Sequence, residues 1–213
     1  HPGAVLYALD TLGTSNRSEL ARALPRLLHH PSVDVRLEAL ARIERLGENT
    51  LLTAITHCWQ HDPDPAVRNA ALQSLATVGG ADTIDQLYDF LNAANNQVRR
   101  SVMIGFLRSG ELEAILAAGE QLTRLVSSPA PTERILAAQI LGESGITSFY
   151  RPLLSMLTDA QPQVQRAALH AARKLHHPKL WPSLIAALAQ PQTRASARTA
   201  LLAAGEALLP TLH

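Results

Sequence analysis

The amino-acid sequence predicts an all-α protein, a right-handed α-solenoid built from antiparallel helix pairs. The first observation is an arginine followed by a glycine eleven residues later, at Arg36/Gly47, Arg68/Gly79, Arg99/Gly110, Arg134/Gly145 and Arg194/Gly205. Gln165 fills the arginine position between the last two pairs, so that the pattern returns after about 30–35 residues, a period typical of stacked helical repeats. The second observation is a stripe of apolar residues at helical spacing around each repeat arginine.

The composition is the third observation. Hydrophobic residues make up 46% of the 213 residues and aromatic residues only 4%. A core built mainly from Leu and Ala suits closely packed helices better than a sheet, which would be enriched in β-branched and aromatic residues. The formal net charge of +1 gives no overall electrostatic reason to bind nucleic acid. The single cysteine, Cys58, excludes an internal disulfide and fits a reducing compartment.

The elements follow from this period. We expect one solenoid over residues 1–213, with six full repeats at about 17–47, 48–80, 81–110, 111–145, 146–177 and 178–205 and partial repeats at 1–13 and 206–213. The first helices are expected at about 17–29, 49–60, 82–93, 111–127, 148–158 and 179–189. The second helices are expected at about 33–46, 65–78, 97–109, 131–144, 162–175 and 191–204. Residues 4–12 match a second helix without its first helix, and both ends of the chain match a fragment of a longer protein.

The second helices are identified by the positions of their apolar residues. Counted from the repeat arginine, positions −1, +3, +4, +7 and +10 are mostly apolar, which makes a one-sided stripe of helical period. In the second repeat these residues are Val67, Ala71, Leu72, Leu75 and Val78. The small residue at +3 lets the two helices of a pair approach closely.

The ends of the second helices are marked by capping residues and breakers. Side chains able to cap a first-turn N–H stand four positions before the repeat arginine, at Ser32, Asp64 and Asn95. A proline stands at the first helical position, where a missing N–H costs nothing, at Pro65, Pro131, Pro162 and Pro191. The glycine eleven residues after the arginine fits a left-handed cap that ends the helix.

The run Asp-Pro-Asp-Pro-Ala-Val-Arg-Asn-Ala-Ala-Leu at 62–72, closed by Gly79, resembles the HEAT repeats, in particular the short bacterial HEAT-like units of the PBS-lyase-like type. This resemblance implies the solenoid fold and a ladder of charge pairs, in which an acidic residue six positions before one arginine meets a neighbouring repeat. Asp62 and Asp159 fit that position, so we expect a fragmentary ladder. Repeat five carries Gln165 in the arginine position and His176 in the glycine position, so we expect it to be the weakest joint.

No constellation in the sequence predicts catalysis. His57 and His61 stand four residues apart and could share a metal ion, but Cys58 points about 100° away and no third ligand is near in sequence. Asp62 and Asp64 are explained by helix capping. Phosphate loops, nucleophile elbows and paired redox cysteines are absent from the sequence. We therefore expect no enzyme, no catalytic residue, no metal site and no cofactor.

The repeat arginines are interpreted as structural residues that bridge neighbouring helix pairs, and a nucleic-acid ladder is the alternative. This interpretation applies to Arg36, Arg68, Arg99, Arg134 and Arg194. A position that recurs at the same phase of every repeat belongs to the interface between repeats more often than to a ligand site.

The expected binding surface lies on the concave side, where second helices project positions +1, +5 and +9 away from the apolar stripe. The candidate binding residues are Asn69, Gln73, Arg100, Ile104, Arg108, Gln139, Arg166 and Lys174. Amide side chains can bond an extended peptide backbone, Ile104 would serve as an apolar anchor, and the cations would favour an acidic segment. A solvated face without a partner is the alternative.

The function that follows is a non-catalytic protein–protein interaction or regulatory scaffold module within a larger protein. The partner would be a protein or peptide segment, acidic or from the same polypeptide, and nucleic acid is not expected. The opening of the chain also looks like HEAT segments attached to bacterial membrane carriers of the nucleotide-translocase type. No apolar run reaches the ~20 residues of a membrane helix, so we expect a cytoplasmic module without direct membrane insertion.

Two other functions are alternatives to the scaffold. Some HEAT-like proteins resemble DNA glycosylases that cradle DNA in a basic groove, and related short repeats serve as chromophore lyases. A salt-dependent shift with DNA would favour the first class. Colour on addition of a bilin would favour the second.

Overall fold

The structure is a computed structural model that describes residues 2–15 and 17–205. Every regular element in this part of the chain is an α-helix or a short 3₁₀ turn, and this part contains no strand. The predicted all-α solenoid of helix pairs is confirmed. The chain divides into two compact units, residues 1–118 and 119–213, which are described one at a time. The expected partial repeat at 206–213 lies outside the described residues.

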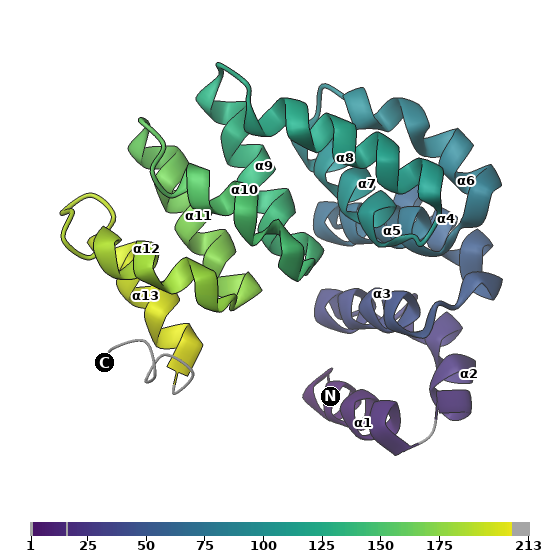
Figure 1. The fold of residues 1–213 in the computed structure, drawn as a ribbon. Helices are drawn as coiled ribbons and strands as arrows, with labels where there is room; N and C mark the ends of the chain where they lie inside the picture. The colour runs from purple at the N-terminus through teal and green to yellow at the C-terminus, as the bar shows by residue number, and fades with distance from the viewer. Residues whose placement is uncertain (1, 16, 206–213) are drawn as a thin grey trace. The chain divides into compact units, whose positions relative to one another are not determined.

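The helices follow the chain in the order that Figure 1 labels. The first unit holds α1 (Pro2–Ser15), α2 (Arg17–Leu27), α3 (Val33–Leu46), η1 (Asn49–Leu51), α4 (Leu52–His61), α5 (Pro65–Val78), α6 (Gly80–Leu87), η2 (Tyr88–Asn92) and α7 (Asn96–Arg108). α8 (Leu112–Val126) contains the boundary between the units. The second unit holds α9 (Pro131–Ser144), η3 (Thr147–Phe149), α10 (Tyr150–Met156), α11 (Pro162–Leu175), η4 (Pro178–Leu180), α12 (Trp181–Ala187) and α13 (Arg194–Ala204).

In each unit the second helices of successive repeats form one layer. α1, α3, α5 and α7 contact one another in chain order, and α2, α4 and η2 pack on α3, α5 and α7. α1 therefore takes the place of the second helix predicted for residues 4–12. In the second unit α9, α11 and α13 form the corresponding layer, and α10 and α12 pack on α11 and α13. The core lies between the two layers and is built mainly from buried Leu, Ile, Val and Ala side chains.

Neighbouring second helices approach each other closely at Gly105 and at Gly142. A Cβ added to Gly105 in α7 would collide with the Cβ of Ala76 in α5. A Cβ added to Gly142 in α9 would lie 2.6 Å from the Cα of Ala171 in α11. Both distances are shorter than real carbon contacts, so a larger side chain at either glycine would force the two helices apart.

The predicted ends of the second helices hold in most repeats. Asp64 and Asn95 each accept a hydrogen bond from a first-turn N–H, and Pro65, Pro131 and Pro162 each open a helix. The prediction for Ser32 was wrong, because its side chain makes no capping bond although the residue stands at the N-cap position.

Two further predictions at the helix ends were wrong. α13 begins at Arg194 rather than at Pro191, because the buried hydroxyl of Thr193 donates to the Ala187 carbonyl and holds the chain in a turn. Gly79 keeps a helical backbone with φ −78°, and its neighbour Gly80 takes the positive φ of 67° instead. The reason is that α6 follows directly, without the loop that separates the other repeats.

Repeat five ends its second helix with a strained residue. His176 is the only non-glycine residue with positive φ in the described part of the chain, at φ 48°. A side chain with a Cβ in this left-handed region costs about 1–3 kcal/mol relative to an unstrained backbone. The cap is thus made at the position predicted, by a residue that is poorly suited to it.

We predict that His176→Gly raises the free energy of unfolding by about 1 kcal/mol, because it relieves the strain while glycine's greater freedom in the unfolded chain offsets part of the gain. Urea denaturation followed by circular dichroism measures this change. His176→Ala is the matched control and should leave the stability nearly unchanged, since alanine keeps the Cβ. An equal gain from alanine would assign the effect to loss of the ring instead.

Candidate functional site

The repeat arginine closes the end of the first helix in its own repeat. The Nη1 atoms of Arg36, Arg68 and Arg134 donate to the carbonyls of His30, Asp62 and Ser128, at 2.8, 2.6 and 2.7 Å. Each acceptor stands six residues before its arginine, in the turn that follows the first helix. Carbonyls at a helix end lack partners within the helix and favour a nearby cation.

The equivalent carbonyl is also bonded in repeats five and six, which depart from the pattern. Gln165 donates from Nε2 to the Asp159 carbonyl at 2.7 Å. Arg194 donates from Nε to the Leu188 carbonyl at 2.9 Å, although α13 starts late. A glutamine is therefore sufficient to close the first helix of repeat five.

A second contact joins neighbouring repeats in two places. Arg36 meets the Asp62 carboxylate with Nε and Nη2 at 2.8 and 2.9 Å, and both side chains are more than nine-tenths buried. Arg134 meets the Asp159 carboxylate in the same bidentate manner, at 2.7 and 2.9 Å. Each unit thus contains one charge pair of the fragmentary ladder.

The bond from Arg134 holds the pKa of the Asp159 carboxyl below its usual value, and the Gln161 N–H adds to this effect while burial opposes it. The carboxylate is therefore charged at neutral pH and remains available to the guanidinium. Its contribution to stability is present above the unfolded pKa, about 3.9, and is lost as the pH falls through the lower folded pKa.

The bridging interpretation is wrong for Arg68. The bonds of Arg68 go to the Asp62 and Pro63 carbonyls of its own repeat, and Ala93 stands where the next repeat would need an aspartate. Arg194 donates to the Leu188 carbonyl of its own repeat, and the residues that follow repeat six lie outside the described residues, so bridging by Arg194 stays a prediction. Arg99 occupies the same place in α7 and is half-buried.

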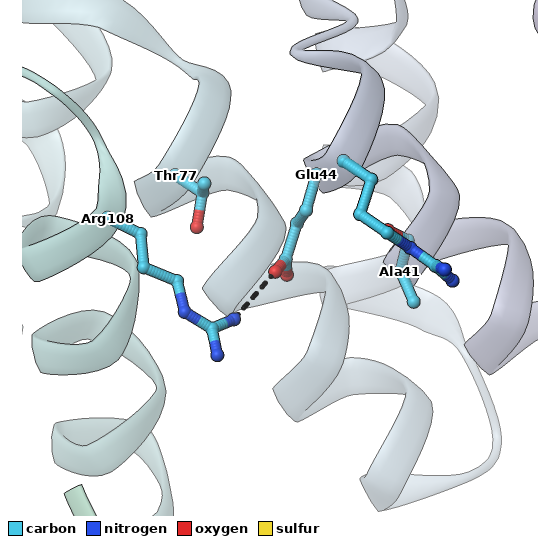
Figure 2. A pocket seen from close by; sticks show the side chains of 5 residues that line it. Ala41, Glu44, Thr77 and Arg108 are labelled. Atoms are coloured by element: carbon cyan, nitrogen blue, oxygen red, sulfur yellow. Dashed lines mark hydrogen bonds and ion pairs between the residues drawn. The ribbon is translucent and has the colours of Figure 1, made fainter. Parts of the chain in front are cut away.

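The layer of second helices in the first unit carries a network around Glu44, which sequence reasoning missed. The Glu44 carboxylate in α3 accepts from Gln73 and Ser74 in α5, at 3.1 and 3.0 Å, and from Arg108 Nη1 in α7 at 3.1 Å. Figure 2 shows Arg108 reaching from α7 toward Glu44. Glu44 and Arg108 line an open groove of about 470 Å³ together with Ala41, Arg45 and Thr77.

The second unit contains a related pair. Lys174 Nζ in α11 lies 3.1 Å from the Glu143 carboxylate in α9. Arg108 and Lys174, two of the cations expected to attract an acidic segment, are therefore each bound to a glutamate of another second helix. The opposite charges were not connected from the sequence because they lie 64 and 31 residues apart.

The remaining candidate residues differ in exposure. Asn69 and Arg100 are half-buried in the first unit, and Gln139 and Arg166 are exposed in the second. The prediction for Ile104 was wrong, because this side chain is only 1% exposed and cannot anchor a partner. α7 is apolar on nearly all sides from Ser101 to Leu107, and a helix of that kind is buried all round.

The histidines near Cys58 gather at one end of the first helices. The rings of His57 and His61 stack at 4.7 Å, and His29 lies edge-on to His57 at 6.2 Å. They line a hollow of about 360 Å³ beside the Arg36–Asp62 pair. The described residues contain no group of three or more potential ligands placed to hold a metal ion. Burial raises the pKa of the Cys58 thiol, with a smaller contribution from Asp62.

Comparisons with known proteins address the family. A family model for HEAT repeats matches residues 6–108 and 120–204. Among curated proteins, none matches the chain. Human deoxyhypusine hydroxylase, solved in complex with glycerol, matches with 15% identity and a TM-score of 0.41, over 93% of this chain and 89% of that one. An engineered protein matches with 20% identity and a TM-score of 0.39, over 88% and 99%. With TM-scores below 0.5, neither structure bears on function.

None of the described helices is both long enough and apolar enough to cross a membrane.

We predict that Arg36→Ala lowers the free energy of unfolding by about 3–5 kcal/mol, because it leaves the Asp62 carboxylate buried without its cation. Arg68→Ala is the matched control from the same position of the next repeat. It should cost only about 1–2 kcal/mol, the value of a charge-assisted bond to a carbonyl. Urea denaturation of both variants tests the difference, and equal losses would contradict the assignment of the ladder.

Proposed function

The chain belongs to the HEAT-repeat family, and we propose that it serves as a non-catalytic scaffold that binds a segment of a partner protein along its second helices. The observation that carries the proposal is the Glu44 network. One carboxylate holds α3, α5 and α7 in fixed register by accepting from Gln73, Ser74 and Arg108. Side chains that stand on these helices are thereby held in place before any partner arrives, which lowers the entropic cost of binding.

The side chains on the second helices of the two units support binding rather than catalysis. Asn69 in α5 and Gln139 in α9 carry amides, which can donate to and accept from an extended backbone. Such a backbone has no bonding partners of its own until it meets a protein surface. The thiol of Cys58 is buried and its pKa is raised, which disfavours the reactive thiolate.

The placement of the small residues also supports a scaffold. Gly105 against Ala76 and Gly142 against Ala171 bring neighbouring second helices close together. Close and regular spacing gives a row of side chains at intervals of about 10 Å or less within each unit. An extended segment could meet one set of side chains in each successive repeat, and the differences between repeats would determine which segment fits.

We predict that a photo-reactive residue placed at Asn69 or at Gln139 cross-links a partner segment, because both stand on second helices. Each unit has a matched control on its first helices, Gln60 in α4 for Asn69 and Ser155 in α10 for Gln139, and both controls are exposed. Cross-linking in cells that express the full-length protein, followed by mass spectrometry, identifies the segment. The synthetic segment is then titrated with the purified chain.

The proposal requires that photo-reactive residues at Asn69 and Gln139 capture the segment and that those at Gln60 and Ser155 do not. It also requires that Asn69→Ala or Gln139→Ala weaken binding of the segment by about tenfold, the equivalent of one charge-neutral hydrogen bond. Equal capture at Gln60 and Ser155 would place the partner on the first helices and overturn the proposal.

A further inference from the structure

The second half of repeat five and the whole of repeat six form a stretch without acidic residues. From Ala160 to Gly205 the sequence contains no Asp or Glu. It contains six basic residues, Arg166, Arg173, Lys174, Lys179, Arg194 and Arg198, and three histidines, His170, His176 and His177. The net charge of +1 for the whole chain conceals this concentration of positive charge in the second unit.

Three of these cations have no partner within the described residues. Lys174 is bound to Glu143, Lys179 donates to the Tyr150 hydroxyl, and Arg194 bonds a carbonyl. Arg166, Arg173 and Arg198 make no hydrogen bond or ion pair in this part of the chain. An arginine that does not serve the fold keeps its five N–H donors available for a ligand.

The unpartnered arginines of α11 stand beside a groove between two second helices. Arg166, His170 and Arg173 lie at positions i, i+4 and i+7 of α11 and therefore share one helical face. A groove of about 220 Å³ separates this helix from α13 and is lined by Leu169, His170, Arg173, Ser196 and Thr199. A guanidinium, an imidazole and a serine hydroxyl are all able to donate to an oxygen anion.

We propose that this groove seats a carboxylate of an acidic protein segment that lies across α11 and α13. The inference rests on the proposed function and names the chemistry of the partner for the second unit. Arg173 and Ser196 hold the carboxylate from the two sides of the groove, and Arg166 meets a second acidic side chain further along α11. Leu169 provides the apolar wall that the aliphatic part of a glutamate can contact.

An acidic peptide suits this surface better than a nucleic acid does. A protein that binds a nucleic acid through its backbone can make on the order of 6–10 phosphate contacts, whereas three arginines of these repeats lack partners within the described residues. Proteins that bind single strands also present aromatic rings on which bases stack. No aromatic side chain other than His170 lines the groove.

His170 reports on the occupant of the groove. Burial lowers the pKa of His170, and the neighbouring charges of Lys174 and Arg173 lower it further, while Glu143 opposes them. The facing residues of α13, Ser196 and Thr199, carry no charge. The ring is therefore mostly neutral at pH 7 in the free protein. A carboxylate in the groove favours the imidazolium, so binding raises this pKa and the affinity increases as the pH falls from 8 to 6.

The test uses the full 213-residue chain and two fluorescein-labelled probes, decaglutamate and a single-stranded oligothymidylate of ten nucleotides, in anisotropy titrations at low salt. We expect decaglutamate to bind and to bind more tightly than the oligonucleotide. Arg166→Gln/Arg173→Gln should weaken its binding at least tenfold. The matched control is Arg22→Gln/Arg26→Gln, which removes the same charge from two exposed arginines on α2 that have no partner within the described residues, and it should change binding less than twofold.

Three results would overturn the inference: no binding of decaglutamate, tighter binding of the oligonucleotide, or equal weakening by the two double variants. Circular dichroism of each variant verifies that it is folded. If decaglutamate fails but a segment is captured at Asn69 or Gln139, the scaffold function stands and only the assignment of the acidic partner fails.

A local readout distinguishes the groove from diffuse attraction. We predict that saturating decaglutamate raises the pKa of His170, measured by NMR titration of its ring. At constant pH, the ring resonances of the exposed His61 in the first unit should shift much less than those of His170 when decaglutamate is added. Arg173→Gln should reduce the rise at His170, because the carboxylate is then held less closely. Equal changes in the ring signals of both histidines would show that the peptide does not occupy the groove.

Discussion

The fold depends on one recurring hydrogen bond, from the repeat arginine to the carbonyl six residues before it. The first helix of each repeat ends in carbonyls that have no partner within the helix, and the chain must then turn back to begin the second helix. Arg36, Arg68 and Arg134 each bond a carbonyl of this turn from the first turn of the following helix. The same bond therefore stabilises the turn in each of these repeats.

The contacts between repeats are built on this local closure. Once the carbonyl accepts one N–H of the guanidinium, the remaining N–H groups can bond an aspartate of the next repeat, as those of Arg36 bond Asp62. Gln165 separates the two roles. It bonds the Asp159 carbonyl but lacks the second set of donors, so repeat five closes its turn without a charge pair to repeat six. Packing between second helices then holds the repeats together, and in each unit a glycine of one second helix lies close against an alanine of its neighbour.

Much of this architecture could be predicted from the sequence because it is local and repeated. The spacing of arginine, proline and glycine placed most second helices within about a residue of their observed ends. The repeat pattern did not predict the structure where one specific side-chain bond, which the period does not encode, decided the outcome. The bond from Thr193 to Ala187 delays the start of α13, and the bond from Arg108 to Glu44 joins residues two repeats apart. Ile104 was predictable in principle, since the run from Ser101 to Leu107 has no polar face to turn toward solvent.

The contact between Glu44 and Arg108 has a consequence for the cooperativity of the first unit. A solenoid is commonly treated as a one-dimensional chain in which each repeat senses only its two neighbours, so that its ends can fray while the middle stays folded. This pair couples α3 to α7 across the intervening α5, and it acts as a second-neighbour term. A partly exposed ion pair contributes only about 1 kcal/mol or less, yet unfolding either flanking repeat forfeits it. The three repeats that carry α3, α5 and α7 therefore keep this ion pair only while all three are folded, which biases them toward melting together rather than one by one.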